Sequence, residues 1–323
     1  MGTAIDREEF TREEYASFAE RLAQNLETLR ALLQRPDFGD GAHTIGAEVE
    51  MHLIDSNAQP ALVNREVLAA AADPRCTLET DAFNFEVNAD AVPLAGQPFS
   101  ALAGSLHELF TRVRSAAATQ NARVLLAGTL PTLTLAHLQA GVLSDAPRYR
   151  AMSRALRDKR GEPFAIHIEG RDTLRAECDD LALEGANASL QVHLRVRPNA
   201  FADAYNAAQL AAAPLLAISG NSPYFDGKCL WEESRIALFK QSVDTRTDET
   251  ERMRTPARVS FGHGWIHDPL TPFLENVALF EPLLPVVSDE PMQAAGDAPP
   301  LAELRLHHGT VWNWNRAVFD PSG

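Results

Sequence analysis

Three stretches of the sequence alternate strictly between apolar and polar residues, and this pattern limits the possible folds more than any other feature. They are residues 44–54, 84–88 and 189–197. Alternation with a period of two predicts β-strands that place one face on a core and leave the other open, which is typical of antiparallel sheets. Two more segments, 123–127 and 304–308, show the pattern less clearly and are weaker strand candidates.

Helical spacing of apolar residues marks four further segments. The first follows Thr11, which forms a capping-box pattern with Glu14, and it continues to about Leu33. The other three helices are expected over residues 98–120, 200–217 and 270–284. Pro214 should kink the third helix or end it early. Strands and helices together predict an α+β fold, with residues 1–38 as an N-terminal helical addition, and the Pro-rich segment 288–300 is expected to be a surface loop.

The charge balance excludes several classes of partner. The 323 residues include 29 Lys and Arg against 44 Asp and Glu, a formal net charge of −15. Nucleic acids and anionic membrane surfaces both attract basic proteins, so neither is an expected partner. The three cysteines are widely spaced and match no zinc pattern, which predicts reduced thiols and a cytoplasmic location. No apolar run has membrane-spanning length and no leader pattern opens the chain, so we expect a soluble protein with small-molecule partners.

The polar faces of the first two strands carry carboxylates. Glu48, Glu50 and His52 follow one another on the first strand, and Glu86 with Asn88 lies on the second. Successive side chains on one strand face are about 6.6 Å apart. Carboxylates at that spacing repel each other unless a cation lies between them. Oxygen ligands of this kind favour a hard cation such as Mg²⁺ or Mn²⁺.

The third strand adds neutral ligands on its polar face. Gln191 and His193 alternate there with apolar residues, and Glu79 lies just before the second strand. On its own, each polar row is typical of a solvated strand face. Three rows built from acids, amides and histidines, rather than from Thr, Lys and Ser, favour a metal site instead.

Familiar catalytic motifs are missing from the sequence. It contains no GxxxxGK[ST], GxGxxG after a strand, GxSxG or HExxH, which argues against a P-loop, a dinucleotide site, a serine hydrolase elbow and a zinc protease. His307 and His308 have no metal spacing and are expected to be buried and hydrogen bonded. Arg148 and Arg150 are cations without an evident partner.

A group of cations follows the third helix. Asn221 lies in an expected turn, and Lys228, Arg235 and Lys240 come shortly after it. Beside a carboxylate-lined sheet, such cations favour an anion site for phosphate or for a substrate carboxylate. Lys240 taken alone is typical of a helix surface.

Five segments, in this order, resemble motifs of the glutamate–cysteine ligase family, in its plant-type and bacterial carboxylate–amine ligase branches. They are GAEVEMHLID (46–55), FEVNADAVPLAG (85–96), RYRAM (148–152), SLQVHLRV (189–196) and ISGNSPYFDGKCLWEESRIALF (218–239). The match covers roughly residues 44–240 and continues loosely through LRLHHGTVWNWNR (304–316). No single motif is specific, but five in the same order are.

The resemblance implies a glutamine synthetase-like catalytic fold over residues 39–323, in which a curved antiparallel sheet forms a funnel with helices packed on one face. It also implies ATP and two or three Mg²⁺ (or Mn²⁺) ions as cofactors. The metal ligands it implies are Glu48, Glu50, Glu79, Glu86 and His193. Lys228 and Arg235 would act as catalytic cations, and the same two residues would bind the nucleotide together with Gln191 and Asn221. His193 occupies a position where plant-type members carry another residue.

The activity implied is the joining of the γ-carboxylate of glutamate to cysteine through an acyl phosphate. Family members continue beyond the final DPSG into a further strand and helices, so the catalytic domain is expected to lack these elements. Three alternatives stay open: a ligase for another amine, a catalytically silent relative that binds nucleotide or amino acid, and a divalent-metal hydrolase. The sequence does not indicate an oligomeric state.

Overall fold

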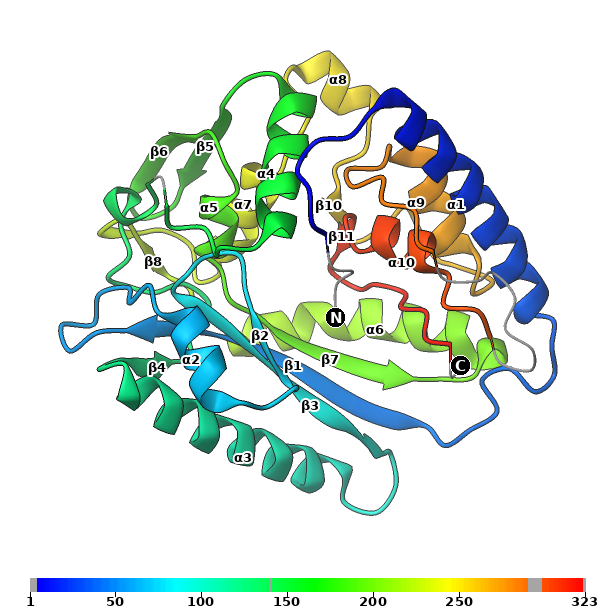
Figure 1. The fold of residues 1–323 in the computed structure, drawn as a ribbon, viewed down its shortest axis with the longest axis horizontal. Helices are drawn as coiled ribbons and strands as arrows, with labels where there is room; N and C mark the ends of the chain where they lie inside the picture. The colour runs from blue at the N-terminus through cyan, green and yellow to red at the C-terminus, as the bar shows by residue number, and fades with distance from the viewer. Residues whose placement is uncertain (1–4, 140, 290–297, 322–323) are drawn as a thin grey trace.

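A five-stranded antiparallel sheet is the centre of the structure, a computed structural model that describes residues 5–139, 141–289 and 298–321 (Figure 1). The strands are β1 (Thr44–Ile54), β2 (Cys76–Leu78), β3 (Asn84–Pro93), β4 (Arg123–Leu125) and β7 (Leu190–Arg195). β1 pairs with β3 along one edge and with β7 and β4 along the other, and β2 pairs with β3. All of these pairings are antiparallel, which confirms the predicted α+β class and the four strand positions in the sheet.

Two helices cover the apolar face of this sheet. They are α2 (Asn64–Ala71) and α3 (Pro98–Thr119). Met51 of β1 and Phe85 of β3 are fully buried against Leu109 and Val113 of α3. Pro98 occupies the first turn of α3, where its missing N–H costs nothing. The helix predicted over 98–120 is therefore confirmed, and its burial leaves the opposite, polar face of β1 and β3 for other elements.

The apolar face of β7 is exposed, contrary to the prediction that each alternating strand rests on a core. Leu190, Val192 and Leu194 are 61%, 55% and 51% exposed. Their register partners on β1 are buried under the helices. The difference arises because β7 lies at the edge of the sheet, beyond β1, whereas α3 packs on β3 and β1.

A second core forms among helices at the other end of the molecule. α1 (Arg12–Leu32) begins at Thr11, whose hydroxyl accepts from the backbone N–H of Glu14, so the capping box is confirmed. Phe18 and Leu29 of α1 are buried in one cluster with α4 (Pro147–Arg160), α9 (Thr271–Leu279) and α10 (Ala302–His308). Figure 1 shows α1 lying alongside α9 and α10.

The strand expected at 304–308 is wrong, because this segment is the helix α10. Leu304, Leu306, His307 and His308 are all buried. A segment buried on nearly every side has no clear period, so short apolar runs of this kind do not distinguish strand from helix. The burial predicted for His307 and His308 is confirmed.

Two other helices differ from the prediction at their ends. α6 (Pro198–Ser219) continues past Pro214 instead of ending at it. α9 ends at Leu279 rather than near residue 284, because Pro282 follows closely and disfavours further helix.

The remaining elements are short. They are η1 (Leu135–His137), β5 (Phe164–Glu169), β6 (Thr173–Cys178), α5 (Ala182–Gly185), β8 (Tyr224–Phe225), β9 (Lys228–Cys229), α7 (Ser234–Ser242), α8 (Glu249–Arg254), β10 (Val259–Ser260) and β11 (Trp312–Asn313). Residues 290–297 of the loop expected at 288–300 lie outside the described residues. None of the described helices is both long enough and apolar enough to cross a membrane.

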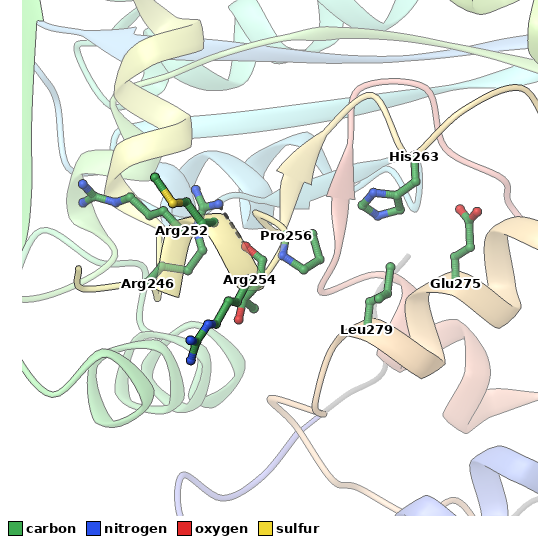
Figure 2. A pocket seen from close by; sticks show the side chains of 9 residues that line it. Arg246, Arg252, Arg254, Pro256, His263, Glu275 and Leu279 are labelled. Atoms are coloured by element: carbon green, nitrogen blue, oxygen red, sulfur yellow. Dashed lines mark hydrogen bonds between the residues drawn. The ribbon is translucent and has the colours of Figure 1, made fainter. Parts of the chain in front are cut away.

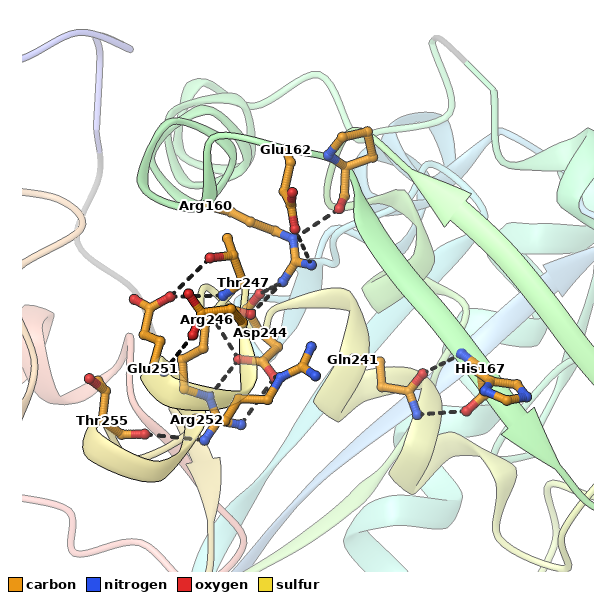
Figure 3. Close-up of polar contacts among 12 residues, drawn as sticks. Arg160, Glu162, His167, Gln241, Asp244, Arg246, Thr247, Glu251, Arg252 and Thr255 are labelled. Atoms are coloured by element: carbon orange, nitrogen blue, oxygen red, sulfur yellow. Dashed lines mark hydrogen bonds and ion pairs between the residues drawn. The ribbon is translucent and has the colours of Figure 1, made fainter.

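Polar contacts hold the segment that follows α7 in place (Figure 3). Arg160, at the end of α4, donates to the backbone carbonyls of Asp244 and Arg246. The carboxylate of Asp244 in turn accepts two hydrogen bonds from the guanidinium of Arg246, Oδ1 from Nε and Oδ2 from Nη2. These bonds fix the start of α8 relative to α4.

Candidate metal centre

Three carboxylates converge on the polar face of the sheet. One oxygen each from Glu50, Glu79 and Glu86 lies within 4.8 Å of the others. Glu50 of β1 is directly opposite Glu86 of β3 in the antiparallel register, and Glu79 follows the end of β2. Because side chains alternate along a strand, the pairing of β1 with β3 places both carboxylates on the same side. An all-oxygen set of this kind fits Mg²⁺ or Mn²⁺.

Neighbouring groups fix the orientation of these carboxylates. The backbone N–H of Ser189, just before β7, donates to Glu50 Oε2 at 2.7 Å. The Thr77 hydroxyl and the Asn88 amide both donate to Glu86 Oε1 at 2.8 Å. The triad is therefore held by β2, β3 and the start of β7 before any ligand binds.

The triad is electrostatically strained in the absence of a cation. Burial, and next the charge of Glu86, raise the pKa of Glu50 to about 8. Burial and the charges of Glu50 and Glu86 raise the pKa of Glu79 well above its usual value. A divalent cation between the three groups would remove this repulsion.

Glu48, Gln191 and His193 lie beside the triad rather than in it. Glu48 Oε1 is 3.6 Å from His193 Nε2, and Gln191 is the register partner of Glu48. Burial, followed by the charge of Glu86, raises the pKa of Glu48. The structure thus brings together three of the five predicted metal ligands. Glu48 lies two residues before Glu50 on β1, and His193 is the register partner of Gly46.

His52 does not lie on an open face, contrary to the prediction for the first strand. It is fully buried, its Nδ1 lies 3.3 Å from the Asn84 amide, and burial lowers its pKa to about 4. The reason is that β4 pairs with β1 at this end of the strand and closes it off from solvent.

The predicted cations are engaged with carboxylates of their own segment. Lys228 Nζ lies 2.8 Å from Asp226 across the β8–β9 turn. Arg235 Nε is 2.6 Å from Glu233, and its Nη1 donates to the Ala188 carbonyl at 3.1 Å. Ala188 precedes the residue that donates to Glu50, so Arg235 is connected to the triad through the start of β7.

Asn221 contributes its side chain to the same region. Its Oδ1 accepts from the backbone N–H of Gly128 at 3.1 Å. A Cβ at Gly128 would come within 2.5 Å of that oxygen, so residue 128 has to be glycine for this contact. The hydrogen bond joins the loop after β4 to the segment that carries Arg235.

Two arginines were not predicted as site residues: Arg316, whose charge acts on Glu48, and Arg148, whose charge acts on Arg316. Arg316 is largely buried; burial lowers its pKa, the charge of Glu48 opposes that change, and the charge of Arg148 adds to it. The Nε of Arg148 is buried without an acceptor, and within the described residues neither guanidinium has a carboxylate within 4.0 Å. Sequence analysis noted Arg148 only as a cation without a partner. Arg316 lies in the loosely matching segment 304–316, which was the one available signal.

Glu184 of α5 is a further carboxylate that sequence analysis missed. Burial raises its pKa to about 7, and its charge raises the pKa values of both Glu50 and Glu79. It belongs to a short helix with no alternating pattern, so the strand argument could not find it.

The model of glutamate-cysteine ligase family 2 matches residues 44–256, which is most of the chain. The chain belongs to glutamate-cysteine ligase family 2. The matched range contains the triad, Glu184, Arg148 and Arg235, whereas Arg316 lies beyond it. A search of the curated proteins gives no match.

A concave surface between α8 and α9 is a less suitable metal site than the triad of Glu50, Glu79 and Glu86. It encloses about 470 Å³ and is lined by residues that include Arg246, Arg252, Arg254, His263 and Glu275. Figure 2 shows that the side chains of Arg252 and Arg254 extend in different directions instead of converging on one point. Arg246 is also engaged with Asp244 at 2.8 Å.

Proposed function

We propose that the protein is an ATP- and Mg²⁺-dependent carboxylate–amine ligase that joins the γ-carboxylate of glutamate to cysteine through an acyl phosphate. The observation that carries the proposal is the convergence of Glu50, Glu79 and Glu86 on one half-buried polar face, in a chain of glutamate-cysteine ligase family 2. The sheet also has helices on one face and carboxylates on the other, which supports the glutamine synthetase-like funnel expected from sequence.

The chemistry explains why such a site needs no nucleophilic side chain. A carboxylate is a poor electrophile, and transfer of a phosphoryl group to it creates a leaving group that an amine can displace. A bound Mg²⁺ would supply neutralisation of the charge on the phosphates. The protein contributes position: Glu50, Glu79 and Glu86 would hold the metal, and the N–H of Ser189 and the hydroxyl of Thr77 keep two of these carboxylates oriented.

Cations complete the site by binding the two anionic reactants. Arg148 and Arg316, which lack a carboxylate partner in the described residues, supply a buried place for the carboxylate of the amino acid. Arg235 and Lys228 would bind the nucleotide phosphates. Asn221, in the same segment, and Gln191, the register partner of Glu48, would assist them. Separate arginines for each anion keep the carboxylate and the phosphoryl group oriented toward each other, which is most of what phosphoryl transfer requires.

The test is ADP and phosphate release from the purified chain with ATP, Mg²⁺, glutamate and cysteine, omitting each component in turn. We expect release only when all four are present. Mg²⁺-ATP binding by calorimetry without turnover on any pair of amino acids would instead support the silent relative. Metal-dependent hydrolysis without ATP would support the hydrolase.

A further inference from the structure

Glu79 is the triad member that lies outside the paired strands. Glu50 and Glu86 are register partners on β1 and β3, so the hydrogen bonds of the sheet fix both of them. Glu79 instead follows the end of β2, in the connection 79–83 that leads to β3. Its carboxylate accepts from the N–H of Thr80, its own neighbour in the chain, at 3.2 Å. The position of Glu79 therefore depends on what holds this connection.

Four successive backbone carbonyls at the start of the connection accept hydrogen bonds from other parts of the chain. The bonds run from the Tyr149 hydroxyl to Leu78 at 2.8 Å, from the Ser144 hydroxyl to Glu79, from the Ser144 N–H to Thr80 at 2.8 Å, and from the Asn64 amide to Asp81 at 3.1 Å. Backbone carbonyls that leave water need such a partner. Three residues thus supply here what a neighbouring strand supplies inside a sheet.

Ser144 is the centre of this arrangement and is 1% exposed. Its hydroxyl accepts from the Asn64 amide at 2.7 Å and donates to the Glu79 carbonyl. The direction of both bonds is fixed, because an amide N–H can only donate and a carbonyl can only accept. With its N–H on the Thr80 carbonyl as well, Ser144 bonds two consecutive carbonyls, and Glu79 cannot move away without breaking these bonds.

The segment 142–149 runs antiparallel to the connection and carries two of the three donor residues. Asp81 and Leu143 form an antiparallel bridge, and the Ala82 N–H donates to the Val142 carbonyl at 2.7 Å. The segment ends in the first turn of α4. Its last two residues open the RYRAM motif, of which the proposed function uses only the first arginine.

A restraint on Glu79 is needed because the other carboxylates repel it. One oxygen from each of Glu50, Glu79 and Glu86 lies within 4.8 Å of the others, and like charges at this distance disfavour each other. An unrestrained connection would relieve the repulsion by moving Glu79 away before a cation binds. The hydrogen bonds to its backbone oppose that movement, and a ligand that is held in place beforehand binds a metal more tightly.

We propose that three side chains act as positioning residues for the metal site, because they hold Glu79 within reach of a cation at the triad. They are Asn64, Ser144 and Tyr149. The inference rests on the proposed function, since it takes the triad as the metal site, and it gives a role to residues that do not touch the ion. Loss of one of their bonds weakens metal binding through Glu79.

The experiment measures the Kd for Mn²⁺ of the full chain without nucleotide, in the wild type, Ser144→Ala and Tyr149→Phe. Electron paramagnetic resonance of the free ion reports binding directly. We expect Ser144→Ala to raise the Kd about 10- to 100-fold, which is the usual effect of removing a group that orients a metal ligand. Tyr149→Phe should raise the Kd by less, because it frees a single carbonyl one residue before Glu79.

Ser242→Ala is the matched control. Ser242 is 0% exposed, and its hydroxyl also donates to a backbone carbonyl, that of Phe239 at 3.1 Å, but both residues belong to α7. This variant should keep the wild-type Kd for Mn²⁺. Melting temperatures in EDTA show whether Ser144→Ala folds. If it does not, Tyr149→Phe carries the test, because it removes one hydroxyl and keeps the ring.

A double-mutant cycle with Glu79→Gln distinguishes positioning of Glu79 from a general loosening of the fold. If Ser144 acts through Glu79, Ser144→Ala should cause no further rise in the Kd once residue 79 has lost its charge. An equal rise in both backgrounds would show that Ser144 stabilises the surroundings as a whole, and the positioning role would be wrong.

The outcomes separate this inference from the proposed function. Mn²⁺ binding that is weakened by Glu86→Gln but unchanged in Ser144→Ala and Tyr149→Phe overturns the positioning role and leaves the ligase proposal intact. A wild type that binds no Mn²⁺, or whose binding is insensitive to Glu86→Gln, contradicts the proposed function itself.

Discussion

Glu86 is the residue whose removal should most cleanly separate metal binding from folding. Its Oε1 accepts two hydrogen bonds, from Thr77 and Asn88, and glutamine can keep that geometry while losing the charge. We expect Glu86→Gln to lower ligase turnover at least about 100-fold, because removing a group that orients or binds a catalytic metal typically costs that much. Turnover is measured as ADP release at saturating Mg²⁺.

Asp90→Asn is the control for that change. Asp90 lies on the same strand, but its side chain is 70% exposed and pairs with Arg75 at 3.0 Å. This variant should keep wild-type turnover. Equal activity of Glu86→Gln and Asp90→Asn would remove Glu86 from the metal site.

The raised pKa of Glu50 predicts that Mg²⁺ binds more tightly as the pH rises. In the folded, metal-free protein the carboxyl keeps its proton until about pH 8, and Mg²⁺ must displace that proton. Affinity should therefore increase up to about tenfold per pH unit between pH 6 and 8 and then level off. Isothermal titration calorimetry across this range measures it, and proton release should be largest at the acidic end.

The raised pKa of Glu50 has the opposite effect on the stability of the metal-free protein, which falls as the pH rises. A carboxyl whose pKa is higher in the folded state than in the unfolded state stabilises the fold fully below its unfolded pKa, and this contribution is lost as the pH rises to about 8. Metal-free protein should thus become less stable across the interval in which Mg²⁺ affinity increases. A Mg²⁺ affinity that does not change between pH 6 and 8 would contradict a protonated Glu50.

Strand periodicity accounts for the part of the site that could be predicted. Alternation alone places Glu48, Glu50 and Glu86 on polar faces, and the register of β1 with β3 does bring Glu50 opposite Glu86. Arg316 and Glu184 could not be found in this way. They reach the site through tertiary packing of a short helix and of a segment near the end of the chain, which no local pattern encodes.

At the scale of single elements, the first turn of α1 offers a direct test of local sequence signals. Thr11 accepts from the Glu14 N–H at 3.3 Å, and Glu14 accepts from the Thr11 N–H at 2.7 Å. Thr11→Ala should lower the free energy of unfolding by about 1 kcal/mol, because it leaves an N–H of the first turn without its acceptor. Urea denaturation measures the change.

Thr28→Ala provides the comparison within the same helix. The Thr28 hydroxyl donates to the Gln24 carbonyl, which is already an acceptor within α1, so its loss leaves no orphaned group. Alanine also has the higher helix propensity, and this variant should be neutral or slightly stabilising. Equal destabilisation by the two substitutions would show that the capping box does not contribute.

Elements were predicted well where one face is solvated and poorly where both faces have the same environment. α1, α3, β1 and β3 each have one buried and one polar side, so their periods are clear. α10 is buried nearly all round, and its sequence pattern wrongly predicts a strand. β7 keeps its strand pattern, yet the pattern could not show that its apolar face lies beyond the helices, since that depends on which strand forms the edge of the sheet.

For the whole molecule, the net charge of −15 has two physically different components. Many carboxylates lie in surface ion pairs, such as Asp145 with Arg65 and Asp179 with Arg157, where solvent screens them. Glu50, Glu79 and Glu86 form a half-buried group whose members repel one another without a cation. Total charge argues only against nucleic acids as expected partners, whereas the fold separates these two components.

The difference between surface carboxylates and the triad predicts how the stability of the whole chain depends on Mg²⁺. Binding to the native state alone stabilises it by RT ln(1 + [Mg²⁺]/Kd), which is about 2.7 kcal/mol at 100 times Kd. The melting temperature of the wild type should therefore rise with Mg²⁺ well beyond the rise seen with NaCl at equal ionic strength, because NaCl screens surface carboxylates but does not bridge buried ones. Differential scanning calorimetry measures both. Glu86→Gln should respond equally to the two salts, and a wild type that does so as well would show that the buried carboxylates do not bind Mg²⁺.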